Sequence, residues 1–127
     1  MDALQAMVNG MSAQWQRERS ESQMTLGKLI ADLEAMPADT EVRGLESAHS
    51  YRGYYCDLAF EPIKAKVKVS SLLAECKAAM GKVFTGYKGG DYVMGESTPV
   101  WISHYGTTGQ KLMAIHKDGT IETADDD

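Results

Sequence analysis

The hydrophobic period of this chain changes near residue 41, and that change is the strongest constraint on its fold. Before it, apolar residues recur at steps of three and four, as they do on one face of a helix. After it, short apolar and alternating runs are separated by glycine, serine and proline, which is typical of strands. The chain is therefore expected to be α+β, with an antiparallel sheet of about six strands flanked by helices and an additional N-terminal amphipathic helix.

Three helices are expected. The first carries an apolar stripe of Leu4, Met7, Val8, Met11 and Trp15. The second follows Thr25 as its N-cap and ends before Pro37, and the third is SLLAECKAAM, with Ser70 as its N-cap and Gly81 just beyond its end. The Met-rich first helix needs a surface to pack against, which is either another subunit or the rest of this chain.

The strand candidates are EVRGLES, YYCDLAFEPI, KAKVKVS, KVFTGYKGGDYVM, TPVWISHYG, QKLMAIHK and GTIETA. The Asp118-Gly119 pair is the strongest hairpin signal among them. A chain of 127 residues suits one shared core. We expect an oligomerisation helix at 1–20, a single α+β ligand-binding domain at 21–121 and a disordered acidic tail at 122–127.

Charge and aromatic residues are concentrated in the middle of the chain. The whole sequence has a net charge of -5, the wrong sign for a generic DNA binder, so no nucleic-acid duplex is expected as a partner. Residues 42–117 nevertheless carry ten Lys or Arg against six acids, and nine of the ten aromatic residues. This mixture suits a ligand with flat bases and phosphates, although a sheet is also rich in aromatic residues for packing reasons.

Several classes of protein are disfavoured. No apolar run approaches the roughly 20 residues of a membrane helix, and the N-terminus lacks the pattern of a signal peptide, so we expect a soluble, unsecreted protein. The histidines and cysteines lack the spacing of metal sites, and no nucleophile motif is present. We therefore expect no metal, no cofactor and no enzymatic activity.

The segment His49–Tyr55 places an imidazole, a guanidinium and three phenols around one glycine. If it is extended, Arg52 and Tyr54 share one face, where they suit a phosphate and an adjacent base. The alternative is a cation–π pair on a strand surface.

A second segment, Phe84–Tyr92, has three glycines whose backbone N–H groups suit a phosphate, with Lys88 supplying charge. Lys88 precedes the Gly pair, so this is not a Walker A loop. The alternative is a plain hairpin turn at Lys88–Asp91.

The segments HSYRGYYCDLAFEP at His49–Pro62 and FTGYKGGDYVMGESTPVW at Phe84–Trp101 resemble the first type of Thoeris anti-defence protein, which phages carry. With TLGKLIADLEAMPADTEV, the resemblance covers roughly residues 24–115. It implies an α+β hexamer in the cytoplasm of the infected bacterial host. The family sequesters cyclic nucleotide signals, such as glycocyclic ADP-ribose isomers and cyclic oligonucleotides, without cleaving them.

Within the resembling segments, the chemistry of the side chains selects six expected ligand contacts: Arg52, Tyr54, Phe84, Tyr87, Lys88 and Lys111. Two other functions stay open. One is a phage protein that inhibits a host defence protein by direct contact, as an anti-CRISPR protein does, with the acidic termini as its contact surface. The other is a nucleotide-processing enzyme.

Overall fold

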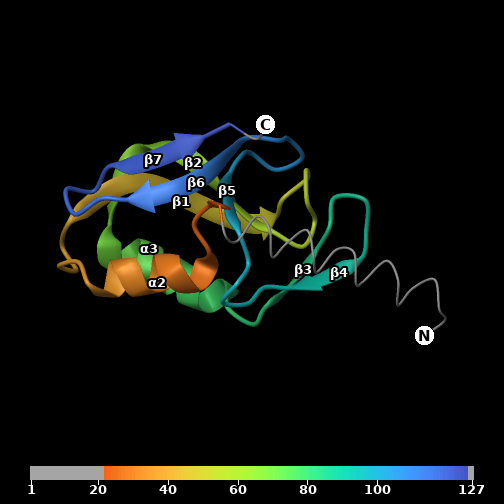
Figure 1. Ribbon diagram of the computed structural model, residues 1–127, viewed down its shortest axis with the longest axis horizontal. Coiled ribbons are helices and arrows are strands. Elements are labelled where there is room, and N and C mark those ends of the chain that lie inside the picture. Colours follow the sequence, from red (N-terminus) through yellow and green to blue (C-terminus); the bar gives the residue numbers. More distant parts are fainter. Residues whose placement is uncertain (1–21, 126–127) are drawn as a thin grey trace.

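A computed structural model describes residues 22–125 (Figure 1). Its elements follow one another as α2 (Leu26–Glu34), β1 (Glu41–Ser50), β2 (Leu58–Lys68), α3 (Val69–Ala79), β3 (Val83–Thr85), β4 (Asp91–Val93), β5 (Val100–Ile102), β6 (Gln110–Ile115) and β7 (Ile121–Ala124). The expected N-terminal helix at 1–20 lies outside the described residues.

The α+β class expected from the sequence is confirmed. Five strands form one sheet in the order β1-β2-β5-β6-β7, and β3 and β4 form a separate hairpin. The main sheet differs from the expected antiparallel sheet of about six strands in two respects: it has five strands, and β2 and β5 are parallel while the other neighbours are antiparallel. The parallel pair arises because α3 and the β3–β4 hairpin intervene between β2 and β5, which is the long crossover that parallel pairing needs.

The core lies between the sheet and the two helices, which lie together on one side of it (Figure 1). Both helices and the strands β1, β2, β5 and β6 contribute fully buried apolar side chains: Leu26, Leu29 and Leu33 from α2, Leu72 and Cys76 from α3, and Val42, Leu58, Phe60, Val100 and Leu112 from the strands. Burial raises the pKa of the Cys76 thiol to about 12, so this cysteine is an inert core residue at neutral pH.

The helix boundaries confirm one predicted cap and correct the other. Thr25 caps α2, because its side chain accepts a hydrogen bond from the backbone N–H of Lys28 at 3.3 Å. Helix α3 starts at Val69, one residue before the expected cap Ser70, and Lys68 at its N-cap makes no side-chain cap. Burial of Val69 explains the earlier start, since this residue faces the core. Gly81 has the left-handed φ of +77° expected beyond the helix end.

The segment around Pro62 also differs from the expectation. Instead of two strands separated by this proline, β2 runs through it. Pro62 lies opposite Leu45, beside a register shift in β1, where a missing N–H is tolerated. Residues 51–57, expected to be extended, instead form the turn between β1 and β2, which the backbone bond from Tyr51 N to Asp57 O closes at 2.9 Å.

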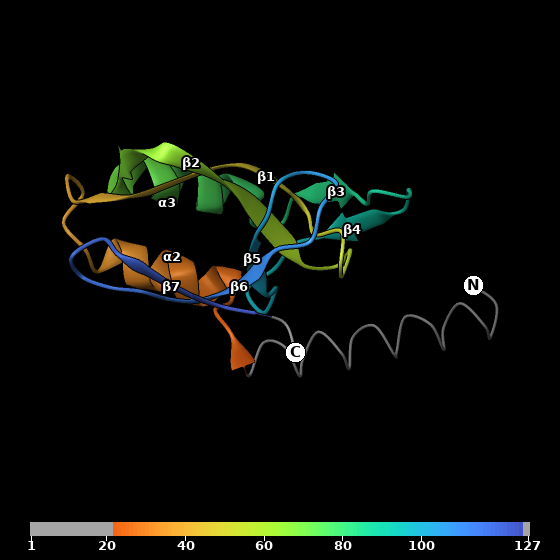
Figure 2. The same ribbon diagram turned by 90° about the horizontal axis from the view of Figure 1, so that it is seen from above.

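The sheet curls until its two ends touch. Figure 2 shows the β1–β2 and β6–β7 ribbons as two arms that meet at β5. The turn at Asp118-Gly119, a hairpin as predicted, reaches back to the free edge of β1, where the N–H of Arg43 donates to the carbonyl of Gly119 at 3.4 Å. This contact covers part of an edge strand that would otherwise be open.

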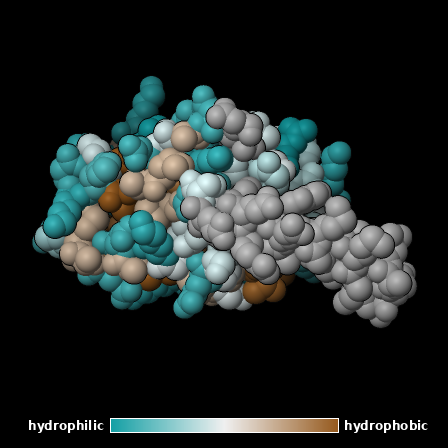
Figure 3. Space-filling model, in the orientation of Figure 1, coloured by the Kyte–Doolittle hydropathy of each residue, from teal (hydrophilic) through white to brown (hydrophobic). Residues whose placement is uncertain are grey.

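The C-terminal boundary of the α+β domain lies further along the chain than expected. Strand β7 confirms the predicted GTIETA strand, so residues 122–124 are not a disordered tail but pair with β6, where Ala124 lies opposite Lys111. Two Gln110 bonds support this end of the strand, one from Thr123 and one to Asp125, both at 3.0 Å. Among the described residues, no helix is long and apolar enough to cross a membrane. On the side of the molecule seen in Figure 1, apolar residues lie at the surface beside β6, whereas the residues along the edge over β7 and β2 are hydrophilic (Figure 3).

Candidate functional site: an exposed arginine on a tyrosine ring

The turn at 51–57 is anchored on its inner side by stacked aromatic rings. Tyr51 is buried, and its ring lies parallel to the Trp101 ring at a centroid distance of 4.3 Å. The indole N–H of Trp101 donates to the buried Asp57 carboxylate at 2.8 Å. Because both ends of the turn are fixed in this way, Arg52, which directly follows Tyr51, is presented from a rigid base.

The Arg52 side chain projects from this turn and lies on the ring of Tyr87, which belongs to the tip of the β3–β4 hairpin. The guanidinium carbon is 4.7 Å from the centroid of the Tyr87 ring. The same guanidinium donates from Nη1 to the carbonyl oxygen of Gly106 at 2.6 Å. An arginine has five N–H donors, so the remaining ones are available for an anion.

A second exposed ring, Tyr105, extends this surface. It meets the Tyr87 ring edge-on at a centroid distance of 6.0 Å. Tyr87 is 44% exposed and Tyr105 is 60% exposed, so both retain free ring area. On its other side Tyr105 meets His49 edge-on at 5.6 Å. We refer to Arg52, Tyr87, Tyr105 and His49 as the Arg52–Tyr87 cluster.

His49 is the buried member of the cluster. Its Nδ1 lies 2.6 Å from the carbonyl oxygen of Ser47, which can only accept, so Nδ1 carries the proton in the neutral ring. Its Nε2 is then an acceptor, and it is buried without a hydrogen-bond partner among the described residues. Ser47 itself has a φ of +54°, an uncommon backbone conformation for a residue with a side chain.

Two contacts hold the loop that carries Tyr105. Glu61 accepts from the backbone N–H of Tyr105 at 3.2 Å and lies 3.4 Å from Nδ1 of His104. The hydrogen bond from Tyr105 is the main cause of the lowered pKa of Glu61. Gly106 follows with a φ of +80°, and a Cβ there would lie 3.2 Å from the Tyr87 ring, so glycine lets the loop approach that ring.

The β3–β4 hairpin is held against the 51–57 turn by a similar close approach. Tyr55 and Tyr92 have ring centroids 6.2 Å apart. A Cβ on Gly86 would lie 3.3 Å from Cγ of Tyr55. A hairpin is present as expected, but its turn spans residues 86–90 and not Lys88–Asp91, because Asp91 already pairs with Thr85 in β4; Gly89 and Gly90 have φ values of +96° and +84°.

Of the six expected contacts, the structure brings Arg52 and Tyr87 together and places Lys88 next to Tyr87 in the chain. Lys88 is exposed at the hairpin tip and makes no ion pair with any residue between 22 and 125. Its ammonium is therefore not neutralised by a described carboxylate. The structure thus joins Arg52 and Tyr87 in one contact, with Lys88 as the next residue of the hairpin turn, and the role of all three in ligand binding stays a prediction.

The expected pairing of Arg52 with Tyr54 is wrong. Because residues 51–57 form a turn, the alternation of a strand does not apply. Tyr54 turns inward and packs on Trp101, with ring centroids 5.6 Å apart. It lines a separate hollow of about 370 Å³, whose wall includes the carboxylate of Asp125.

Phe84 and Lys111 also lie outside the cluster. Phe84 is half-buried against the core, and the Lys82 ammonium lies 5.1 Å from its ring centroid. Lys111 is half-buried on β6, between Trp101 and Ala124 in the pairing of the strands. The contact between Arg52 and Tyr87 involves neither residue.

Sequence reasoning missed Tyr105, a member of the cluster, and Gly106, whose carbonyl oxygen accepts from Arg52. Both belong to SHYGTTG, which the sequence presents as the end of a strand and a turn. An aromatic residue next to glycine in a loop was the available signal, since loops that a rigid scaffold positions often carry binding residues. His49 lies within the segment His49–Tyr55 that the sequence singles out, but it is not among the six expected contacts.

The arrangement is suited to binding. Exposed phenol rings offer faces on which a base stacks, and the guanidinium offers paired N–H donors to a phosphate. Among residues 22–125, no group of three or more His, Cys, Asp or Glu side chains is placed to hold a metal ion. No family model, no curated protein and no solved structure matches the chain.

Proposed function

We propose that this protein binds and sequesters a cyclic nucleotide signal, without cleaving it, on the Arg52–Tyr87 cluster. The observation that carries the proposal is the exposed guanidinium of Arg52, 4.7 Å from the centre of an exposed phenol ring and beside a second one. A ligand with a base and a phosphate satisfies both parts at once, because the base stacks while the phosphate accepts from the guanidinium.

The biological setting of the proposal comes from the resemblance to the Thoeris anti-defence family. In this setting the protein is a phage sponge in the cytoplasm of the infected bacterial host. It removes glycocyclic ADP-ribose isomers or cyclic oligonucleotides before they activate a defence effector. Assembly into a homo-oligomer, a hexamer by resemblance, would place several such clusters on one particle.

Capture and release of the ligand tests the proposal. The full-length protein is incubated with a glycocyclic ADP-ribose and, separately, with a cyclic dinucleotide, freed of unbound ligand by gel filtration, and then heat-denatured. Mass spectrometry of the released small molecules is expected to return the intact ligand. A chemically altered product would assign an enzyme instead, and absence of any retained nucleotide would favour the direct protein-contact alternative.

A matched pair of arginine variants locates the site. Arg52→Ala is expected to abolish retention, whereas Arg43→Ala, which removes an exposed arginine at the other end of the β1–β2 ribbon, is expected to keep it. Equal retention by the two variants would place the nucleotide elsewhere.

A further inference from the structure

A second hollow, which bears several cations, shares no lining residue with the Arg52–Tyr87 cluster. It has a volume of about 570 Å³ and lies between the β1–β2 ribbon and the β6–β7 turn. The lining consists of Arg43, Pro62, Ile63, Lys64, Lys66, Asp118, Gly119, Thr120 and Ile121. We refer to it as the cationic groove.

The three cations share one face of the β1–β2 ribbon. Lys64 and Lys66 are two residues apart on β2, and Arg43 lies directly opposite Lys66 on β1. The backbone N–H of Arg43 points away from β2 and donates to Gly119. Arg43 and Lys66 therefore form a non-hydrogen-bonded pair of the antiparallel ladder, in which the two Cα atoms lie only about 4.5 Å apart. Like charges directly opposite one another are unfavourable unless an anion lies between them.

No carboxylate of residues 22–125 neutralises these three cations. Each is exposed, and none forms an ion pair with another described residue. The next pair on the same face of the ribbon differs, since Lys68 lies opposite Glu41 and forms an ion pair with Asp39 at 3.7 Å. Unneutralised charge is thus a property of the groove and not of the whole ribbon.

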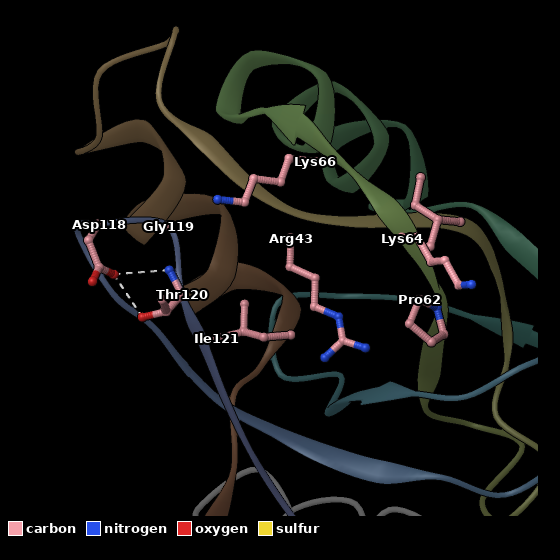
Figure 4. A pocket seen from close by; sticks show the side chains of 9 residues that line it. Arg43, Pro62, Lys64, Lys66, Asp118, Gly119, Thr120 and Ile121 are labelled. Carbon is pink, nitrogen blue, oxygen red and sulfur yellow. Dashed lines mark hydrogen bonds between the residues drawn. The ribbon is translucent and has the colours of Figure 1, made fainter.

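The one acidic residue that lines the groove, Asp118, forms its hydrogen bonds within its own turn. Oδ1 of Asp118 accepts from the backbone N–H of Thr120 at 3.0 Å and from its hydroxyl at 2.7 Å (Figure 4). The Thr120 N–H bond lowers the pKa of Asp118. Figure 4 shows the Lys66 ammonium directed toward this turn and the Arg43 guanidinium between Ile121 and Pro62, with Lys64 at the Pro62 end.

The wall opposite the cations is fixed in place. Gly119 has a φ of +91°, and a Cβ there would lie 2.0 Å from the carbonyl oxygen of Glu41. This close approach, with the hydrogen bond from Arg43 N, holds the β6–β7 turn against β1. The groove is therefore formed before any ligand arrives, which reduces the ordering cost of binding.

We infer that the cationic groove binds the phosphate or diphosphate group of a small phosphorylated molecule. Arg43 and Lys66 face the anion from adjacent strands, Lys64 adds charge at one end, and the apolar surface of Pro62, Ile63 and Ile121 suits the organic part of such a ligand. This site is separate from the Arg52–Tyr87 cluster and does not rest on the function proposed for it.

Calorimetric titration of the full-length protein with inorganic pyrophosphate at low salt tests this site. Wild type is expected to bind, and Lys66→Gln is expected to weaken binding about tenfold and to flatten its dependence on salt, because one charge-assisted contact is lost. The same variant relieves the repulsion from Arg43, so its melting temperature without ligand is expected to equal or exceed that of wild type. A lower melting temperature together with unchanged binding would make Lys66 a structural residue and overturn the site.

Lys68→Gln serves as the matched control, because it removes a lysine of the same strand that pairs with Asp39 and does not line the groove, and it is expected to leave pyrophosphate affinity unchanged. Loss of pyrophosphate binding in Arg52→Ala but not in Lys66→Gln would overturn the inference while supporting the Arg52 site. A nucleoside 5′-diphosphate in a parallel titration distinguishes an organic phosphate, which is expected to bind more tightly than pyrophosphate, from an inorganic one. Binding of duplex DNA without any binding of pyrophosphate would also overturn the proposal.

Discussion

The guanidinium of Arg52 lies on the ring of Tyr87, although one belongs to the turn after β1 and the other to the tip of the β3–β4 hairpin. The contact depends on supports from three further segments. Trp101 and Asp57 fix the turn, Gly106 accepts from Arg52, and Tyr55 meets the hairpin through Tyr92. A binding surface assembled from loops on such supports is held close to its bound geometry before the ligand arrives.

Arg52→Ala is expected to separate ligand binding from folding. Loss of the group that meets a desolvated phosphate costs about 2–5 kcal/mol of binding free energy. In the free protein Arg52 is exposed, and its contacts with Tyr87 and Gly106 are expected to contribute less than about 1 kcal/mol to stability. Calorimetric titration with a cyclic nucleotide and a thermal melt of the same variant measure the two quantities; equal losses in both would make Arg52 structural.

Tyr87 is expected to tolerate another ring but not its removal. Stacking of a base on an aromatic face contributes about 1–3 kcal/mol, and any ring offers such a face. Tyr87→Phe is therefore expected to keep most of the affinity for the cyclic nucleotide, whereas Tyr87→Ala loses it. Should both variants bind equally well, the ring would serve only as a platform for the Arg52 side chain or for the loop at Gly106.

Lys88 is expected to act as a point charge at the hairpin tip. Lys88→Met keeps the length of the side chain and removes its charge, so it is expected to weaken nucleotide binding and to reduce its dependence on salt. Lys28→Met is the control, because Lys28 lies on α2 with Asp32 at 3.9 Å, on another part of the surface. If both variants retain the affinity and salt dependence of wild type, the glycine-rich hairpin is a turn without a binding role.

The first 20 residues are expected to hold subunits together, because their apolar stripe precedes an α+β domain that has its own core. Deletion of Met1–Ser20 is expected to lower the mass of the assembly in light scattering while the circular dichroism of the α+β domain persists. A full-length protein that is already monomeric, or a truncated one of unchanged subunit number, would contradict this prediction.

Local signals in the sequence were sufficient for elements whose contacts are close in the chain. Thr25 and the stripe at Leu26, Leu29 and Leu33 define α2, and Asp118-Gly119 defines a hairpin. These features depend on hydrogen bonds and faces within a few residues, which periodicity and turn chemistry report directly.

The candidate sites depend on contacts that no local pattern contains. In the segment from Tyr51 to Tyr55, glycine and tyrosine suit either a strand or a turn, and the stack of Tyr51 on Trp101 decides for the turn. In the turn conformation, Tyr54 points inward and Arg52 points outward. The pairing of Arg43 with Lys66 likewise depends on a register that shifts between Arg43 and Leu45, where Gly44 lies so close to β2 that a Cβ would be 2.1 Å from the Ala65 carbonyl.

The glycine at position 119 is expected to be essential for closure of the sheet. Gly119→Ala would combine a left-handed backbone with a Cβ only 2.0 Å from the Glu41 carbonyl oxygen, so either the turn or β1 must shift. We expect the free energy of unfolding to fall by more than the roughly 1 kcal/mol that positive φ alone costs, and pyrophosphate binding in the cationic groove to weaken, because the β6–β7 wall moves.

Gly89→Ala provides the comparison that separates the two causes. Gly89 has a similar φ of +96°, but no atom lies within 4 Å of the position that its Cβ would occupy. In urea unfolding, we therefore expect the free energy of unfolding to fall slightly for Gly89→Ala and clearly more for Gly119→Ala. The difference between them measures the contact with Glu41, since the backbone penalty is common to both. Equal losses would mean that the turn adjusts freely and that the groove wall is not held by this approach.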